Sequence, residues 1–104
     1  MVNKYGARRT FSKLCQRWFD SKAECRRGED LHLLQLGAQI SDLEYQPAYV
    51  LSRDPKVGYR ADFRYRDEYG NLIVEDVKGV MTKECRVKLA WVKQKYLIEV
   101  VIIK

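Results

Sequence analysis

The fold of this chain is decided by residues 59–78, which read YRADFRYRDEYGNLIVEDVK. Residues 59–65 alternate between apolar and polar side chains, which is the period of a half-buried strand. Residues 72–78 are rich in side chains that favour strands. A short polar segment with a glycine separates the two runs, so residues 59–78 are predicted to form a β-hairpin.

The register of this hairpin depends on Gly70. If Gly70 takes the left-handed position of a three-residue loop, Asp67 pairs with Asn71. Counting back along both strands, this register places Asp62 directly opposite Asp76. Two carboxylates so placed repel each other unless something compensates their charge, and a divalent cation is the compensation that we expect.

Strand parity selects the other members of the site. Because the period of a strand is two, Lys78 projects on the same face as Asp76, whereas Glu75 and Val77 project on the opposite face. Asp76 is therefore a better metal-ligand candidate than Glu75. Two carboxylates and a lysine on one face suggest metal-dependent cleavage of a phosphodiester.

An ordinary ion pair explains the same pattern. The spacing Asp-x-Lys also occurs at residues 20–22 and 54–56. An acid and a lysine on a strand often form an exposed cross-strand pair, worth about 0.2–1 kcal/mol. The triplet at 76–78 has more weight than the other two only because of its strand context and the opposed Asp62.

The positive charge of the chain is concentrated at its N-terminal end. The formal net charge is +6; residues 1–28 carry eight Lys or Arg and two acids, whereas residues 29–104 carry twelve of each sign. We interpret residues 1–18 as a basic arm that suits a polyanion, with nucleic acid first and an acidic membrane surface second. A merely solvated basic segment fits the charge equally well. The basic residues assigned to DNA contact in this arm are Lys4, Arg8, Arg9, Lys13 and Arg17.

Aromatic residues are interleaved with these cations. They either stack on bases or pack over neighbouring elements. The four aromatic residues are Tyr5, Phe11, Trp18 and Phe19.

Several other classes of protein are disfavoured by the sequence. No apolar run has the length of a membrane span, and the basic segment lacks the apolar stretch of a signal peptide. The three cysteines form no C-x-x-C pair, and the single histidine, His32, has no partner that suggests catalysis. There is no glycine-rich phosphate loop, so no nucleotide cofactor is expected. We expect one cytosolic domain over residues 1–104.

A helix is predicted from Ser21 to about Leu36. Ser21 and Glu24 have the spacing of a capping box, and Gly37 supplies a stop. Helical periodicity turns Glu24 towards the core side, where it is either a site residue or a helix cap that returns a hydrogen bond to Ser21.

The remaining elements complete the order helix, three strands, helix, strand. A strand is predicted over residues 44–51, with Pro47 indicating an edge or a bulge. Thr82 is the expected N-cap of a helix to about Tyr96, and Lys83 on this helix is assigned to DNA, although a solvated face is the default for such a residue. The apolar run 97–103 is predicted to be a strand buried on both sides.

This order of elements resembles the core of the PD-(D/E)XK nuclease superfamily, with an acid on the first helix, an Asp on the second strand and acid-x-Lys on the third. More narrowly, the chain is similar to a family of small phage-encoded proteins catalogued as a domain of unknown function. The matching stretches are residues 3–7, Phe19-Asp20-Ser21-Lys22 with Glu24, 40–44 with Gln46-Pro47, 59–63, and 74–79.

The resemblance implies a restriction-endonuclease-like α/β fold of order αβββαβ, with a mixed central sheet flanked by helices. It also implies a Mg²⁺- or Mn²⁺-dependent DNA endonuclease, similar to phage Holliday junction resolvases. By motif position Asp62 and Asp76 would bind the metal, Lys78 would act on the attacking water or the developing charge, and Glu24 would complete the acidic set. The backbone carbonyl of Val77 is a further possible ligand.

Three functions remain open on the sequence. The first is an endonuclease for branched DNA that acts in recombination, expected to be a homodimer because two symmetric cuts need two copies of a one-site protein. The second is a nucleic-acid-binding module without turnover. The third is a phage interaction protein whose acidic triad consists of surface ion pairs.

Overall fold

The computed structural model describes residues 8–104, which form two helices and eight strands. Four of the strands make a mixed sheet in the order β3-β6-β7-β8, in which only β7 and β8 are parallel. The α/β class predicted from the sequence is therefore confirmed. In chain order the elements are β1 (Thr10–Ser12), β2 (Arg17–Phe19), α1 (Lys22–Leu36), β3 (Ser41–Tyr45), β4 (Ala48–Arg53), β5 (Lys56–Arg60), β6 (Phe63–Arg66), β7 (Leu72–Val77), α2 (Lys83–Tyr96) and β8 (Val101–Ile103).

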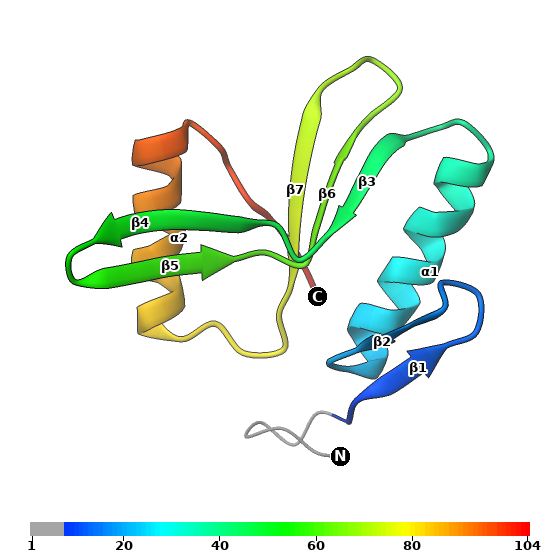
Figure 1. The fold of residues 1–104 in the computed structure, drawn as a ribbon, viewed down its shortest axis with the longest axis horizontal. Coiled ribbons are helices and arrows are strands. Elements are labelled where there is room, and N and C mark those ends of the chain that lie inside the picture. Colours follow the sequence, from blue (N-terminus) through cyan, green and yellow to red (C-terminus); the bar gives the residue numbers. More distant parts are fainter. Residues whose placement is uncertain (1–7) are drawn as a thin grey trace.

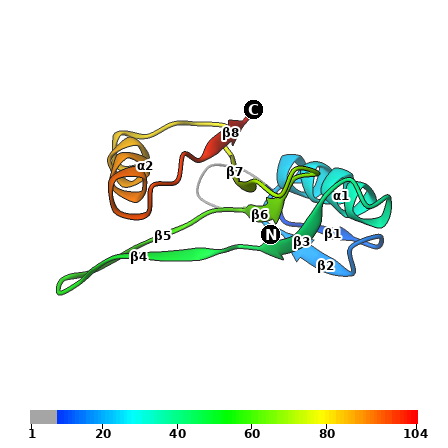
Figure 2. The same ribbon diagram turned by 90° about the horizontal axis from the view of Figure 1, so that it is seen from above.

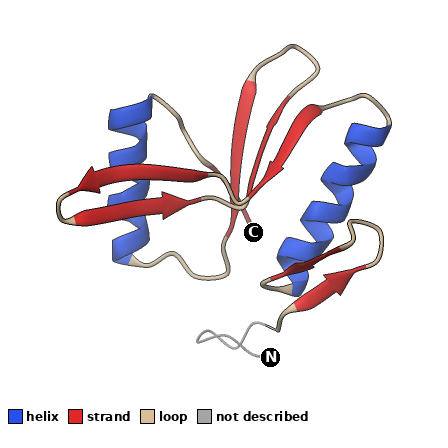
Figure 3. Cartoon of the chain, viewed as in Figure 1, coloured by secondary structure: helices blue, strands red, loops and turns tan. Residues whose placement is uncertain are grey.

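Two hairpins and two helices surround the central sheet (Figure 1). The β1–β2 hairpin packs with α1 on one side, and the β4–β5 hairpin packs with α2 on the other, as the view from above also shows (Figure 2). The predicted order of six elements contained neither hairpin as a separate unit. In Figure 3 the long strands at the centre lie between the two helices.

The predicted register of the central hairpin is confirmed. Phe63 pairs with Glu75, and Arg66 pairs with Leu72, so that the register continues to Asp67 and Asn71 in the turn. Gly70 has a φ of 84°, and the Asp67 amide donates to the carbonyl oxygen of Asn71 at 2.9 Å. A left-handed glycine thus closes the loop as expected.

The predicted single strand Tyr59–Tyr65 is wrong, because the chain divides there into β5 and β6, which belong to different sheets. The predicted strand Glu44–Leu51 divides in the same way into β3 and β4, between Tyr45 and Ala48.

The two breaks lie side by side and are joined by backbone hydrogen bonds. The Gln46 amide donates to the Asp62 carbonyl at 2.9 Å, and the Ala61 amide donates to the Pro47 carbonyl at 3.0 Å. Pro47 has no amide hydrogen and Gln46 has a φ of 54°, so neither continues a regular ladder. One long hairpin therefore bends at this level, and the bend places Asp62 at the edge of the central sheet.

Both predicted helices are present with the predicted caps. The Ser21 hydroxyl accepts from the Glu24 amide at 3.1 Å, and α1 ends at Gly37. The Thr82 hydroxyl accepts from the Cys85 amide at 3.1 Å. None of the helices in residues 8–104 is long and apolar enough to cross a membrane.

The core consists of two apolar clusters, one under each helix. The α1 cluster is built from Phe19, Cys25, Leu31, Ile40, Phe63 and Tyr65. The α2 cluster is built from Tyr49, Leu51, Tyr59, Ala61, Val74 and Val92. Residues 59, 61, 63 and 65 all point inwards as their alternation predicts, but the first two join the α2 cluster and the last two the α1 cluster.

The C-terminal prediction is wrong in length and in burial. Only Val101–Ile103 of the apolar run forms a strand, and this strand lies at the edge of the sheet with Val101 exposed. Leu97 instead ends α2 with a φ of 58°. An apolar run here reflects packing of the connecting segment, since Ile98 and Val100 lie against the α2 cluster.

Candidate active site

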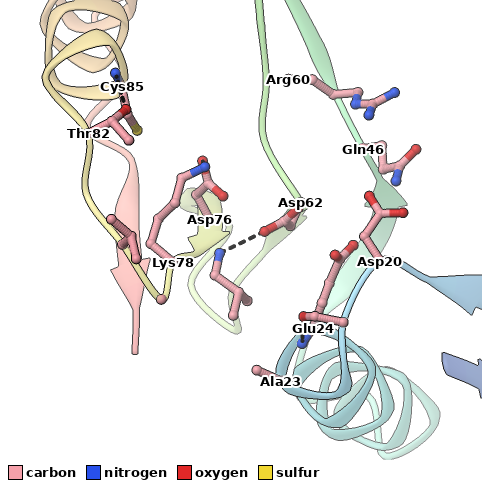
Figure 4. Close-up of a pocket in the computed structure, with 14 residues that line it drawn as sticks. Asp20, Ala23, Glu24, Gln46, Arg60, Asp62, Asp76, Lys78, Thr82 and Cys85 are labelled. Atoms are coloured by element: carbon pink, nitrogen blue, oxygen red, sulfur yellow. Dashed lines mark hydrogen bonds and ion pairs between the residues drawn. The ribbon is translucent and has the colours of Figure 1, made fainter. Parts of the chain in front are cut away.

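A cleft of about 560 Å³ opens between the N-terminal ends of α1 and α2 (Figure 4). The bend at Asp62 and the end of β7 form its floor. Four carboxylates and two basic side chains line it, and the polar lining comprises Asp20, Ser21, Glu24, Gln46, Arg60, Asp62, Asp76, Lys78 and Thr82. The fold therefore brings together all four predicted catalytic residues, Glu24, Asp62, Asp76 and Lys78.

Asp76 is buried on β7, with an exposed fraction of only 2%. Its Oδ2 atom accepts a hydrogen bond from the Tyr59 hydroxyl and lies 3.3 Å from Nζ of Lys78. Burial and the nearby carboxylate raise the pKa of Tyr59 above its usual range, so Tyr59 remains a neutral donor. Two donors thus hold one oxygen of Asp76 in place.

Asp62 is held by the backbone of the strand opposite. The Val77 amide donates to its Oδ2 atom at 2.7 Å, and the Asp62 amide donates to the Glu75 carbonyl at 3.0 Å. Burial, the charge of Glu24 and hydrogen bonding with Asp76 raise the pKa of Asp62 to about 8. The paired residues of β6 and β7 end at Phe63 and Glu75, and the two hydrogen bonds of Asp62 hold it against Glu75 and Val77, the two neighbours of Asp76.

Glu24 is buried in the first turn of α1, with an exposed fraction of 5%. Burial and the charge of Asp20 raise its pKa to about 7. Figure 4 shows the side chains of Asp20, Glu24 and Asp62 turned towards the same space. The cleft thus holds more negative charge than its own cations neutralise.

Lys78 lies beside Asp76 with its side chain partly buried. Burial lowers the pKa of this lysine, but the charge and hydrogen bond of Asp76, together with the charges of Cys85 and Asp62, raise it overall. Lys78 is therefore a positive charge held at the edge of the acidic space.

Glu75 lies on the other face of β7, as strand parity predicts. Arg27 donates to both of its oxygens at 2.7 Å, and the Tyr65 hydroxyl donates to one of them. The sequence patterns gave no sign of this buried ion pair, because Arg27 is 48 positions away.

The residues of the cleft fit a divalent cation held by two carboxylates. In residues 8–104 no three His, Cys, Asp or Glu side chains are grouped closely enough to hold a metal ion, so Glu24 does not complete a three-ligand set. Mg²⁺ commonly binds one or two carboxylates, with water and substrate phosphate as its other ligands. Asp62 and Asp76 are the two carboxylates that could supply such a pair; burial first, and the charge of Glu24 second, raise the pKa of Asp62.

The basic residues assigned to DNA occupy different places. Lys83 is exposed at the start of α2, and Arg8, Arg9 and Lys13 are exposed near or in the β1–β2 hairpin. Arg17 is half-buried, with its guanidinium 4.0 Å from the centroid of the Tyr45 ring. Lys4 lies outside the described residues.

The basic arm is structured over much of its length. Residues 10–19 form the β1–β2 hairpin, and Ser12 in this hairpin is buried and donates to Glu29 of α1 at 2.6 Å. Phe19 belongs to the core, whereas Phe11 and Trp18 are exposed. Tyr5 lies outside the described residues.

Sequence reasoning missed two charged residues of the cleft, Asp20 and Arg60, and also Tyr59, which donates to Asp76. Asp20 carried a signal, because it opens one of the two Asp-x-Lys repeats that were set aside. Tyr59 and Arg60 carried none, since their places depend on the bend at residues 61 and 62.

Of the three comparisons with known proteins, one found a match. No curated protein and no solved structure matches this chain. A family model described as "Protein of unknown function (DUF1064)" matches residues 2–103. Because the match spans nearly all of its length, the chain belongs to the DUF1064 family.

Proposed function

We propose that this protein is a divalent-metal-dependent DNA endonuclease that hydrolyses phosphodiester bonds in branched DNA, in the manner of a Holliday junction resolvase. We propose Mg²⁺ or Mn²⁺ as its cofactor, a homodimer as its active form and the cytoplasm as its location. The observation that carries the proposal is that Asp62, just before β6, and Asp76, on β7, line one cleft together with Lys78.

The order of elements supports the same assignment. If the two hairpins β1–β2 and β4–β5 are set aside, the order is α1, β3, β6, β7, α2, β8. This order supports the proposal of a restriction-endonuclease-like core, for which the order αβββαβ was expected. In the proposed assignment, the acid of α1, the Asp before β6 and the Asp-x-Lys at the end of β7 correspond to the acidic and lysine positions of that core.

Each residue has a role that follows from its contacts. A bound Mg²⁺ would lower the pKa of water and neutralise charge on the phosphate. Asp62 and Asp76 would hold it, with the Val77 carbonyl as a further proposed ligand. Tyr59 and the Val77 amide fix the orientation of the two carboxylates. Lys78 places a positive charge where the attacking water and the developing phosphate charge would lie.

The proposal is tested by incubating the protein with linear duplex, single-stranded, flap and four-way-junction DNA, with and without Mg²⁺ or Mn²⁺. We expect cleavage that requires the metal and is lost in Asp76→Asn. Glu68→Gln is the matched control, because Glu68 is an exposed acid in the β6–β7 turn. Cleavage that persists in Asp76→Asn would come from a contaminating nuclease and would contradict the assignment.

A nucleic-acid-binding module without turnover is the second candidate. It is favoured by the lack of a three-ligand group in residues 8–104. It is also favoured by the raised pKa values of Glu24 and Asp62, because protonation of these two carboxyls reduces the negative charge of the cleft without a metal. In the same experiment, binding to DNA without cleavage at any metal concentration would select this candidate.

A further inference from the structure

The two faces of the β1–β2 hairpin differ in composition. Thr10, Ser12 and Phe19 are at least partly buried, and Ser12 and Phe19 are almost fully covered. Phe11 and Trp18 point the other way, because side chains alternate along a strand. They are directly paired across the hairpin and remain 44% and 52% exposed.

The exposed side chains form an ordered aromatic surface. The rings of Phe11 and Trp18 meet edge to face with centroids 5.4 Å apart. The guanidinium of Arg9 lies over the Trp18 ring, 5.3 Å from its centroid. We call the group of Arg9, Phe11 and Trp18 the aromatic platform.

The charge around the platform selects the chemistry of its ligand. Residues 8–19 contain no acid, and three of their cations, Arg8, Arg9 and Lys13, are exposed, whereas Arg17 is half-buried over the Tyr45 ring. A surface with exposed rings and only positive charge suits a polyanion that itself has exposed π faces, which describes nucleic acid with accessible bases. A protein partner with an apolar face would not require the three exposed cations.

The platform lies next to the acidic cleft. Trp18 and Asp20 are two positions apart at the end of β2, and Asp20 lines the cleft. Trp18 lies in β2, and Asp20 is the first residue after this strand, so the platform and the cleft are neighbours along the chain. A base resting on Trp18 would therefore belong to the same stretch of strand as the phosphate in the cleft.

We propose that the aromatic platform stacks on unpaired or junction-exposed bases, and so selects single-stranded or branched DNA over continuous duplex. Inside a duplex each base face is covered by its neighbours, so the rings find a partner only at an end, a flap, a junction or a single strand. The inference deepens the proposed function and rests on DNA being its ligand. It does not depend on cleavage.

The chain offers a direct readout, because Trp18 and Trp91 are its only tryptophans. In Trp91→Phe, which removes the tryptophan packed against the α2 cluster, all tryptophan fluorescence comes from Trp18. The titration is done in EDTA, so that no cleavage occurs, with oligothymidine, a four-way junction and relaxed closed-circular duplex, which has no ends. We expect quenching by the first two DNAs and little quenching by the circle.

Affinity is measured separately for Trp18→Ala and Phe11→Ala. Loss of one base–aromatic stack predicts roughly tenfold weaker binding of oligothymidine and of the junction. Binding to the circular duplex should change less than about twofold, because phosphate contacts are retained. Trp18→Phe should restore most of the affinity, and Leu14→Ala is the matched control, since Leu14 is an exposed apolar residue of the same hairpin outside the platform.

Three results would overturn the proposal. The first is DNA binding without any change in Trp18 fluorescence, and the second is an equal loss of affinity for all three DNAs in Trp18→Ala. The third is a change from dimer to monomer in Trp18→Ala, seen by sedimentation, which would assign the platform to a second copy of the chain. Metal-dependent cleavage without quenching would remove this proposal alone, whereas quenching without cleavage would remove only the nuclease.

Discussion

Glu75 and Asp76 are neighbours on β7, and each is 2% exposed, but their two faces differ in charge balance. Glu75 receives two hydrogen bonds from Arg27 and one from Tyr65, so its charge is fully paired. Asp76 has Tyr59 and Lys78 but shares its space with further carboxylates. A balanced buried carboxylate is a structural element, whereas an unbalanced one is available to a cation.

The largest expected effect is a loss of stability when the charge of Glu75 loses its partner Arg27. In Arg27→Met the charge of Glu75 stays buried without its partner, which should lower the free energy of unfolding by about 3 kcal/mol. Denaturant unfolding measures this change. In the double variant Arg27→Met, Glu75→Met the loss should be smaller, because no charge is left buried. A single variant as stable as the wild type would show that the Glu75 cluster is not a structural ion pair.

Replacing Lys78, the cation beside Asp76, should instead affect activity more than stability. In Lys78→Met we expect cleavage of junction DNA to fall about 100-fold or more, since a positioned charge at the reacting phosphate is lost. Stability should change less than in Arg27→Met, because Lys78 makes one ion pair at 3.3 Å, whereas Arg27 makes two hydrogen bonds at 2.7 Å. Lys88→Met is the control, as Lys88 is a lysine of α2 whose ion pair with Glu84 lies outside the cleft. A large loss of stability in Lys78→Met would place it with Arg27 as a structural cation.

The difference between the two faces of β7 was predictable from the sequence only in part. Gly70 and the alternation of residues 59–65 and 72–77 determine the register, which pairs Phe63 with Glu75; Asp62 comes directly before and Asp76 directly after this pair. These are local signals. The partner of Glu75 is Arg27, on a helix 48 positions earlier. No local sequence pattern predicts which arginine of the chain forms this ion pair.

The bend at Asp62 was also beyond local signals. The alternation of residues 59–65 continues through it, because each side chain still points into one of the two clusters. Pro47 indicated an irregularity in its own strand, but the effect on the neighbouring strand follows from the hydrogen bond that the Ala61 amide donates to Pro47. The prediction of a buried strand over residues 97–103 was wrong for a related reason. Apolar content alone does not distinguish a strand from a connecting segment that packs against the core.

The unbalanced face should make stability depend on pH. The pKa of Glu24 rises from 4.5 to about 7, and that of Asp62 from 3.8 to about 8. The folded chain thus binds more protons than the unfolded chain between these values, so the free energy of unfolding should fall as the pH rises from about 4 to about 8. We expect a loss of at least about 1 kcal/mol, measured by urea unfolding across this range.

The double variant Glu24→Gln, Asp62→Asn is the control for this pH dependence. It removes both groups and should flatten the curve between pH 4 and 8. A wild-type protein that gains stability over the same range would show that the cleft is not overcharged.

The smallest expected effect is stabilisation by metal. A cation that binds only the folded chain adds roughly 1.4 kcal/mol when its concentration is ten times its dissociation constant. We therefore expect Mg²⁺ or Mn²⁺ to raise the melting temperature of the wild type at pH 8, where Glu24 is largely ionised and Asp62 is about half ionised. Asp62→Asn, Asp76→Asn should show no such rise, whereas Arg27→Met, although less stable, should still respond, since its defect lies on the other face of β7. Equal rises in the wild type and in the double aspartate variant would mean that the cation binds elsewhere, and that the imbalance at Asp76 does not create a metal site.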